Sequence, residues 1–89
     1  MHEITITVRH EVGLHARPAA LFVQAAKKFQ SAITVSKDEK EVNAKSILSI
    51  LTLGVNQNTV ITIKADGADE EEAVKALQEL VESNFAEAG

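Results

Sequence analysis

Residues 2–29 read HEITITVRHEVGLHARPAALFVQAAKKF, and within this stretch the hydrophobic period changes from two residues to about 3.6 residues. Over residues 2–8, Ile and Val alternate with Thr, as a half-buried strand requires. Over residues 16–29 the apolar side chains fall on one stripe at helical spacing. Pro18 suits the first helical turn, because its missing N–H has no intrahelical acceptor there. The stretch therefore predicts a strand, a loop and a helix.

The rest of the chain continues this alternation of short strands and helices. We predict a strand at 33–36, a turn at 37–40, a short strand at 41–44, a helix at 46–53, a turn at 56–58, a strand at 59–65 and a helix from 69 to about 84. Ser46 is a natural N-cap, and Gly54 suits the left-handed position after the helix. The order β-α-β-β-α-β-α predicts an α+β fold with helices packed on one face of a sheet. With no linker or repeat, residues 1–89 are expected to form one domain.

The last helix has the clearest local signals. Asp69 followed by Glu72 resembles a capping box, in which each side chain bonds to the other residue's backbone N–H. Acidic residues in the first turn also suit the helix dipole. The predicted buried stripe of this helix consists of Ala73, Leu77, Leu80 and Val81.

Composition excludes several classes of protein. The chain has 89 residues, no cysteine and a net charge of −4. The absence of cysteine favours a reducing compartment, and with no secretory signal or long apolar run we expect a cytoplasmic protein that inserts into no membrane. The negative charge and the presence of only three aromatic residues, all Phe, argue against nucleic-acid binding.

The segment from Gly13 to Pro18 is the part of the chain that calls for a chemical explanation. His15 precedes the first helical turn, where unpaired backbone N–H groups and the helix dipole attract anions. A phosphoryl group on its imidazole would meet the N–H groups of Ala16 and Arg17, and the guanidinium of Arg17 would clamp the phosphate oxygens. We predict a depressed pKa for His15, which keeps the attacking nitrogen neutral. The alternative is that His15 is a weak helix cap and Arg17 a solvated surface residue.

No cofactor or metal is predicted. His2 and His10 have no metal-ligand spacing with His15, and surface or strand-end positions suit them better. The sequence also has no carboxylate pair, Ser-His-Asp set or glycine-rich phosphate loop that would compete with the segment around His15.

The chain resembles the HPr family, the histidine-containing phosphocarriers of the bacterial phosphoenolpyruvate-dependent sugar phosphotransferase system. The resemblance covers essentially the whole chain and is strongest at GLHARPAA (13–20), with further matches at AKSI through LG (44–54) and DGADE (66–70). It implies an open-faced β-sandwich: a four-stranded antiparallel sheet of order 1-4-2-3, covered on one face by three helices. It also implies that His15 accepts phosphate on Nδ1 from phosphorylated enzyme I, assisted by Arg17, and passes it to IIA domains of sugar permeases. Such a protein is a monomeric carrier and not an enzyme with a small-molecule substrate.

Ser46 has a second role in part of this family. In Gram-positive members the matching serine is phosphorylated by an HPr kinase/phosphorylase, which adds a dianion near the histidine and weakens docking to enzyme I. The resemblance therefore also suggests this kinase and a catabolite-control transcription regulator as partners.

The helix at 46–53 carries more apolar residues than one buried face can hold. With Ile50 and Leu53 directed inward, other apolar side chains must face solvent. We predict a docking surface formed by Ile47, Leu48 and Leu51 together with Ala20 and Lys27 of the first helix. Scattered surface hydrophobic residues are the alternative.

Three positions depart from the family pattern. Val12 stands where many members have Asn or Ser, and Ser49 stands where Gly or Lys is common. Asp38-Glu39 replaces the Asn-Gly pair that is common between these two strands and favours a tight hairpin turn, so the resemblance by itself does not imply that geometry here.

Three other functions stay open at this point. A paralogous carrier could regulate nitrogen or other metabolism without moving sugar. A pure interaction module could bind a regulator through Ile47 and Leu48, in which case His15→Ala would keep full activity. An enzyme with His15 as general base is the weakest alternative, because the sequence offers no second catalytic group.

Overall fold

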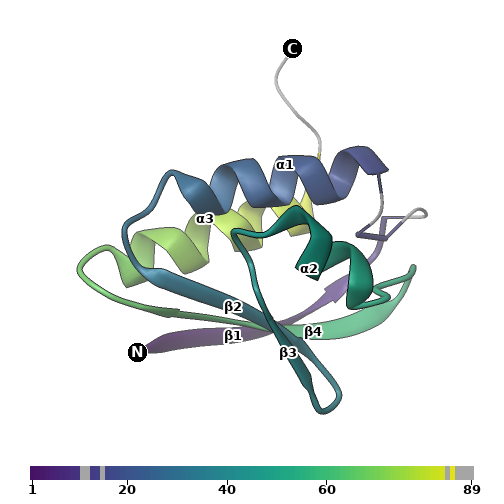
Figure 1. The fold of residues 1–89 in the computed structure, drawn as a ribbon, viewed down its shortest axis with the longest axis horizontal. Coiled ribbons are helices and arrows are strands. Elements are labelled where there is room, and N and C mark those ends of the chain that lie inside the picture. Colours follow the sequence, from purple (N-terminus) through teal and green to yellow (C-terminus); the bar gives the residue numbers. More distant parts are fainter. Residues whose placement is uncertain (11–12, 15, 84, 86–89) are drawn as a thin grey trace.

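The computed structural model describes residues 1–10, 13–14, 16–83 and 85, and these contain four strands and three helices (Figure 1). The elements are β1 (His2–Val8), α1 (Ala16–Lys27), β2 (Ala32–Lys37), β3 (Lys40–Asn43), α2 (Ile47–Thr52), β4 (Thr59–Asp66) and α3 (Glu70–Glu82). Their order confirms the predicted β-α-β-β-α-β-α. The bounds differ from prediction by one or two residues, chiefly at the ends of helices, where the last turn often frays.

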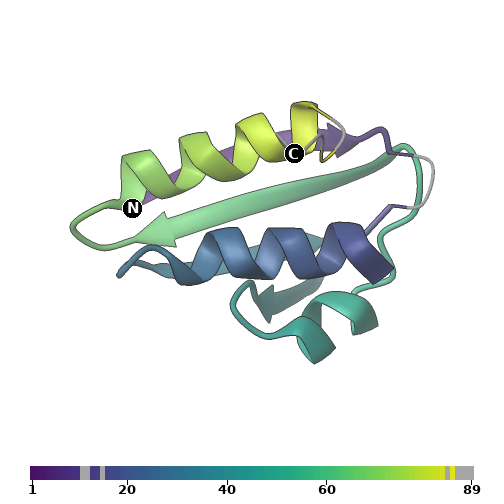
Figure 2. The ribbon, with the colours of Figure 1, turned by 90° about the horizontal axis from the view of Figure 1, so that it is seen from above.

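The strands form one antiparallel sheet of order β1-β4-β2-β3. β4 lies between β1 and β2, with Ile63 opposite both Ile4 and Val35. The three helices lie on the same face of this sheet, and the other face is uncovered (Figure 1). Seen from above, α3 runs along β1, whereas α2 lies on the opposite side of α1, near β3 (Figure 2). The predicted α+β architecture is confirmed.

The core lies between the sheet and the helices. Alternate residues of β4 point into it, and these are Ile61, Ile63 and Ala65. The buried face of α1 includes Phe22, and that of α2 includes Ile50. In α3 the buried residues are Ala73, Val74, Leu77 and Val81. The predicted stripe differs at one position, because Val74 is buried whereas Leu80, which was predicted to be buried, is only partly so.

The turn predicted at 37–40 is present between β2 and β3, and it is tight although Asp38-Glu39 replaces the Asn-Gly pair that favours such a turn. Lys37 and Lys40 are register partners, so Asp38 and Glu39 alone form the turn. Asp38 has a φ of 55°. Aspartate tolerates this left-handed conformation better than most residues, which allows it to stand where glycine or asparagine is more usual.

The capping box predicted at Asp69 and Glu72 is wrong. Asp69 is the N-cap of α3, but its side chain makes no hydrogen bond to that helix. Its Oδ2 accepts from the N–H of Gln30 at 2.9 Å, and its Oδ1 accepts from the N–H of Ser31 at 2.9 Å and from the Ser31 hydroxyl at 2.5 Å. Three donors from the segment after α1 thus occupy the carboxylate, and a local sequence pattern carries no information about them.

Candidate functional site

The predicted phosphate-binding segment connects β1 to α1. His15 and Val12 lie outside the described residues, so the described neighbours on both sides define the site. These neighbours are Gly13 and Leu14 on one side and the first turn of α1 on the other.

Gly13 and Leu14 are fixed against the segment that leads into β4. The Gly13 N–H donates to the His10 carbonyl at 2.9 Å, and the Leu14 N–H donates to the Val55 carbonyl at 3.0 Å. Leu14 and Val55 are fully buried. Gly13 has a φ of +71°, and a Cβ atom there would clash with the Val55 carbonyl oxygen. The chain therefore enters α1 along a path that only glycine fits.

The first turn of α1 has the charge pattern of an anion site. α1 has 12 residues and no acidic residue in its first turn. Pro18 is buried, and Arg17 is exposed. The helix dipole and the unpaired N–H groups of a first turn both favour a negative group, and Pro18 contributes no N–H of its own. These features favour an anion at the start of α1, and the binding of phosphate by Ala16 and Arg17 stays a prediction.

Two lysines hold the C-terminal end of α2 close to the same loop. Lys40 Nζ donates to the Thr52 carbonyl at 2.6 Å, and Lys37 Nζ donates to the Gly54 carbonyl at 2.8 Å. Cations suit the exposed carbonyls at a helix end. Both lysines come from the β2–β3 hairpin, so the hairpin fixes the segment before Val55, against which Leu14 is bonded.

The C-terminal segment also contacts this loop. The ring of His10 meets the ring of buried Phe85 edge to face, with centroids 5.7 Å apart and an angle of 81° between the planes. His10 is therefore packed next to a structural aromatic residue. This position agrees with the strand-end role expected for it.

The predicted docking residues lie on two neighbouring helices. A surface depression of about 240 Å³ between α1 and α2 is lined by Ala20, Val23, Gln24, Lys27 and Ile47. It brings together three of the five predicted docking residues. Sequence reasoning missed Gln24, although positions 20, 24 and 27 are spaced so that they share one helix face.

The α2 side chains divide between core and solvent as predicted. Ile50 and Leu53 are buried, whereas the exposed fractions are 38% for Ile47, 73% for Leu48 and 37% for Leu51. The exposure of these three apolar side chains is confirmed, and their role in docking stays a prediction.

Ser46 is the N-cap of α2, as predicted. Its φ and ψ are −114° and 114°, and its Oγ accepts from the Ser49 N–H at 3.3 Å. Its side chain is half-buried. Phosphorylation of this hydroxyl stays a prediction.

The pKa of Asp69 is shifted, but this residue lies where α3 begins, at the end of the molecule away from the loop between β1 and α1 (Figure 1). The hydroxyl of Ser31, together with the N–H groups of Gln30 and Ser31, lowers the pKa of Asp69 from its ordinary value of 3.8. Hydrogen bonds to the charged form cause this shift, so it supports the fold and has no part in the candidate site.

Among the described residues, no group of three His, Cys, Asp or Glu side chains could hold a metal ion. In the same part of the chain, none of the helices has both the length and the apolar character needed to cross a membrane.

Comparison with known proteins points to one family. Residues 2–83 match the family model described as the PTS HPr component phosphorylation site. The crystal structure of an HPr protein (HPr-C-His) from Thermoanaerobacter tengcongensis superposes with a TM-score of 0.96 at 58% identity and covers 100% of both chains. The phosphocarrier protein HPr of Xylella fastidiosa is 49% identical over 86 residues, covering 97% of this chain and 94% of the relative. The HPr-like protein Crh of Halalkalibacterium halodurans is 46% identical over 82 residues, covering 92% and 98%.

Proposed function

The chain belongs to the HPr family of phosphocarrier proteins, and we propose that it carries its phosphoryl group on His15. Phosphorylated enzyme I is the proposed donor, and IIA domains of sugar permeases are the proposed acceptors. The observation that carries the proposal is the anion-favouring first turn of a 12-residue helix directly after His15. We further propose that residues 1–89 act as one domain and as a cytoplasmic protein.

The proposed chemistry follows from the residues around position 15. A neutral imidazole nitrogen has a lone pair at pH 7 and attacks phosphorus without a separate base. As the N–P bond forms on His15, the bond between phosphorus and the donor breaks, and no water takes part. The N–H groups of Ala16 and Arg17 would bind the phosphate oxygens, and the Arg17 guanidinium would neutralise their charge.

The chain does not complete this reaction alone. The described neighbours of His15 offer anion-binding groups but no second nucleophile or base. Each partner must therefore contribute the other half of the reaction, which is what a carrier requires. We propose that both partners dock on the depression between α1 and α2 and on exposed Leu48 and Leu51. Apolar side chains exposed next to a reactive residue are typical of a docking surface.

The test is phosphorylation by purified enzyme I with phosphoenolpyruvate, followed by mass measurement of the intact chain. We expect one acid-labile phosphate on the wild type and none on His15→Ala. His2→Ala is the matched control, because His2 is an exposed histidine on β1 and should leave the reaction unchanged. A phosphate that persists in His15→Ala would overturn the proposal.

A second candidate function is favoured by the similarity to the HPr-like protein Crh. We propose that Ser46 is a regulatory phosphorylation site. An HPr kinase/phosphorylase would phosphorylate it, and a catabolite-control transcription regulator would bind the phosphorylated form. Ser46 begins α2, the same helix that carries exposed Ile47 and Leu48. A phosphate there would add about two negative charges beside the docking surface and weaken the binding of an acidic partner.

Ser46→Asp and Ser46→Ala separate this role from the carrier role. Aspartate adds charge and still caps the helix, whereas alanine removes the cap alone. We expect Ser46→Asp to slow phosphorylation of His15 by enzyme I, and Ser46→Ala to leave the rate close to wild type. Equal rates in both variants would contradict the regulatory proposal and leave the carrier proposal intact.

A further inference from the structure

Lys37 is the last residue of β2, and its side chain is bonded to the segment that follows α2. Its Nζ donates to the Gly54 carbonyl at 2.8 Å, and the side chain is half-buried. The end of α2, the end of β1 and the start of α1 lie at the same end of the molecule (Figure 2). The bond from Lys37 therefore fixes a segment that lies close to the loop before α1.

The link from Lys37 to this loop passes through Val55. The carbonyls of Gly54 and Val55 belong to the two peptide units on either side of the Val55 Cα atom. Lys37 binds the first carbonyl, and the Leu14 N–H donates to the second at 3.0 Å. The side chains of Val55 and Leu14 are fully buried, so the backbone between the two carbonyls cannot rotate without moving a packed side chain. A fixed Gly54 carbonyl therefore fixes the acceptor of Leu14.

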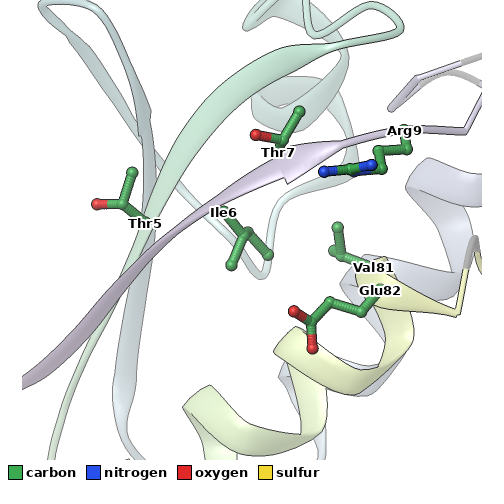
Figure 3. Close-up of a pocket in the computed structure, with 6 residues that line it drawn as sticks. All are labelled: Thr5, Ile6, Thr7, Arg9, Val81 and Glu82. Atoms are coloured by element: carbon green, nitrogen blue, oxygen red, sulfur yellow. The ribbon is translucent and has the colours of Figure 1, made fainter.

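The segment between α2 and β4 is anchored at both ends. Residues 53–58 form neither helix nor strand, and the Asn58 N–H donates to the Val8 carbonyl at 2.6 Å. Beside this end of β1, on the side of α3, lies a hollow of about 470 Å³ lined in part by Arg9 and Glu82 (Figure 3). β1 thus holds the Asn58 end of the segment, whereas the end nearer α2 is held from the β2–β3 hairpin.

We propose that Lys37 is a positioning residue for phosphoryl transfer at His15. It acts through Gly54 and Val55, which fix Leu14. Because Leu14 directly precedes His15 in the chain, a displaced Leu14 moves the backbone from which the imidazole extends. A displacement of about 1 Å in a reacting group can slow a reaction by about a hundredfold, so the loss of one distant anchor is measurable. This role rests on the proposed carrier function.

Lys40 offers a matched comparison within the same hairpin. Its Nζ donates to the Thr52 carbonyl at 2.6 Å. Thr52 is the last residue of α2, and its carbonyl does not belong to a peptide unit beside Val55. Methionine at position 37 or 40 keeps an unbranched side chain and removes one positive charge and one bond to a backbone carbonyl. Both variants should therefore lose similar stability, whereas Lys37→Met alone should release Leu14.

Amide hydrogen exchange of the unphosphorylated protein, measured by NMR, tests the positioning step by itself. The reference is the Asn58 amide, because it belongs to the same segment but bonds to β1. We expect the ratio of the Leu14 exchange rate to the Asn58 rate to rise about tenfold in Lys37→Met, since the acceptor of Leu14 is no longer fixed. In Lys40→Met the ratio should stay within about twofold of wild type.

Phosphorylation by enzyme I with phosphoenolpyruvate tests the consequence for the reaction. Lys37→Met should lower kcat about tenfold and leave KM within about twofold, because the depression between α1 and α2 is unchanged. Lys40→Met should keep kcat within about twofold of wild type. Lys37→Arg keeps the charge and can donate to the same carbonyl, so it should restore kcat to within about threefold of wild type.

A wild-type kcat in Lys37→Met would overturn the proposal. So would a raised KM at unchanged kcat, which would make Lys37 a docking cation. Equal losses of kcat in Lys37→Met and Lys40→Met would also reject it, because the effect would then follow stability, which urea unfolding of each variant measures. An unchanged exchange ratio at Leu14 would reject the positioning step.

Failure of the carrier function gives a different result. A wild type that takes no phosphate on His15 would overturn that function, whatever the state of Lys37. The exchange ratio at Leu14 needs no phosphate, so it still decides whether Lys37 and Leu14 are coupled. The two proposals can therefore fail separately.

Discussion

The Oδ1 atom of Asp69 accepts hydrogen bonds from both the hydroxyl and the N–H of Ser31, at 2.5 Å and 2.9 Å. Ser31 is buried and belongs to the segment that follows α1, whereas Asp69 begins α3. The pair therefore ties the end of the first helix to the start of the last. Gly67 lies against the same serine, because a Cβ atom there would be 2.6 Å from the Ser31 Oγ.

Asp69→Asn should reduce stability near neutral pH and change how stability depends on pH. Because the folded pKa of Asp69 lies below the ordinary value of 3.8, its contribution is present above about pH 4 and is lost as the pH falls through the folded pKa. Urea unfolding at several pH values should show the wild type and the variant converging in acid. Glu71→Gln removes a charge from the first turn of the same helix and serves as control. A constant difference at all pH values would contradict the assignment.

Gly13→Ala should destabilise the protein more than Gly54→Ala. Both glycines have a φ slightly above +70°, so left-handed strain costs each variant about 1–2 kcal/mol. At Gly13 the new Cβ would also meet the Val55 carbonyl, whereas at Gly54 the nearest atom is the Lys37 Nζ at 3.6 Å. The clash should add about 2 kcal/mol of unfolding free energy. Urea unfolding measures both values, and equal losses would show that the contact with Val55 is unimportant.

Two α2 variants should separate folding from docking. Ile50→Ala should lower the free energy of unfolding by about 2–5 kcal/mol, because Ile50 is fully buried. Leu48→Ala should change it by less than about 0.5 kcal/mol, since the side chain is 73% exposed. If Leu48 belongs to the docking surface, its loss should raise the KM for phosphorylation by enzyme I. An unchanged KM would remove Leu48 from that surface.

Arg17→Lys should test whether the guanidinium geometry matters beyond its charge. Lysine keeps the positive charge but loses the planar pair of donors, so we expect phosphate transfer to slow by about tenfold. Arg9→Lys makes the same exchange at an exposed position on the other side of the loop and should transfer phosphate normally at micromolar concentration. Wild-type rates in Arg17→Lys would reduce the role of Arg17 to simple charge.

The sequence by itself determined the order of the elements, the Ser46 cap and the division of α2 between buried Ile50 and exposed Leu48. These features depend on the hydrophobic period and on residues three or four positions apart, so they can be predicted from local sequence patterns. Only the tertiary structure decided the partners of Asp69, which lie 38 and 39 positions away, and the depression shared by α1 and α2. It also decided that β1 is an edge strand, because strand order depends on how distant segments pack. The alternation of apolar residues within one strand does not specify which strands lie beside it.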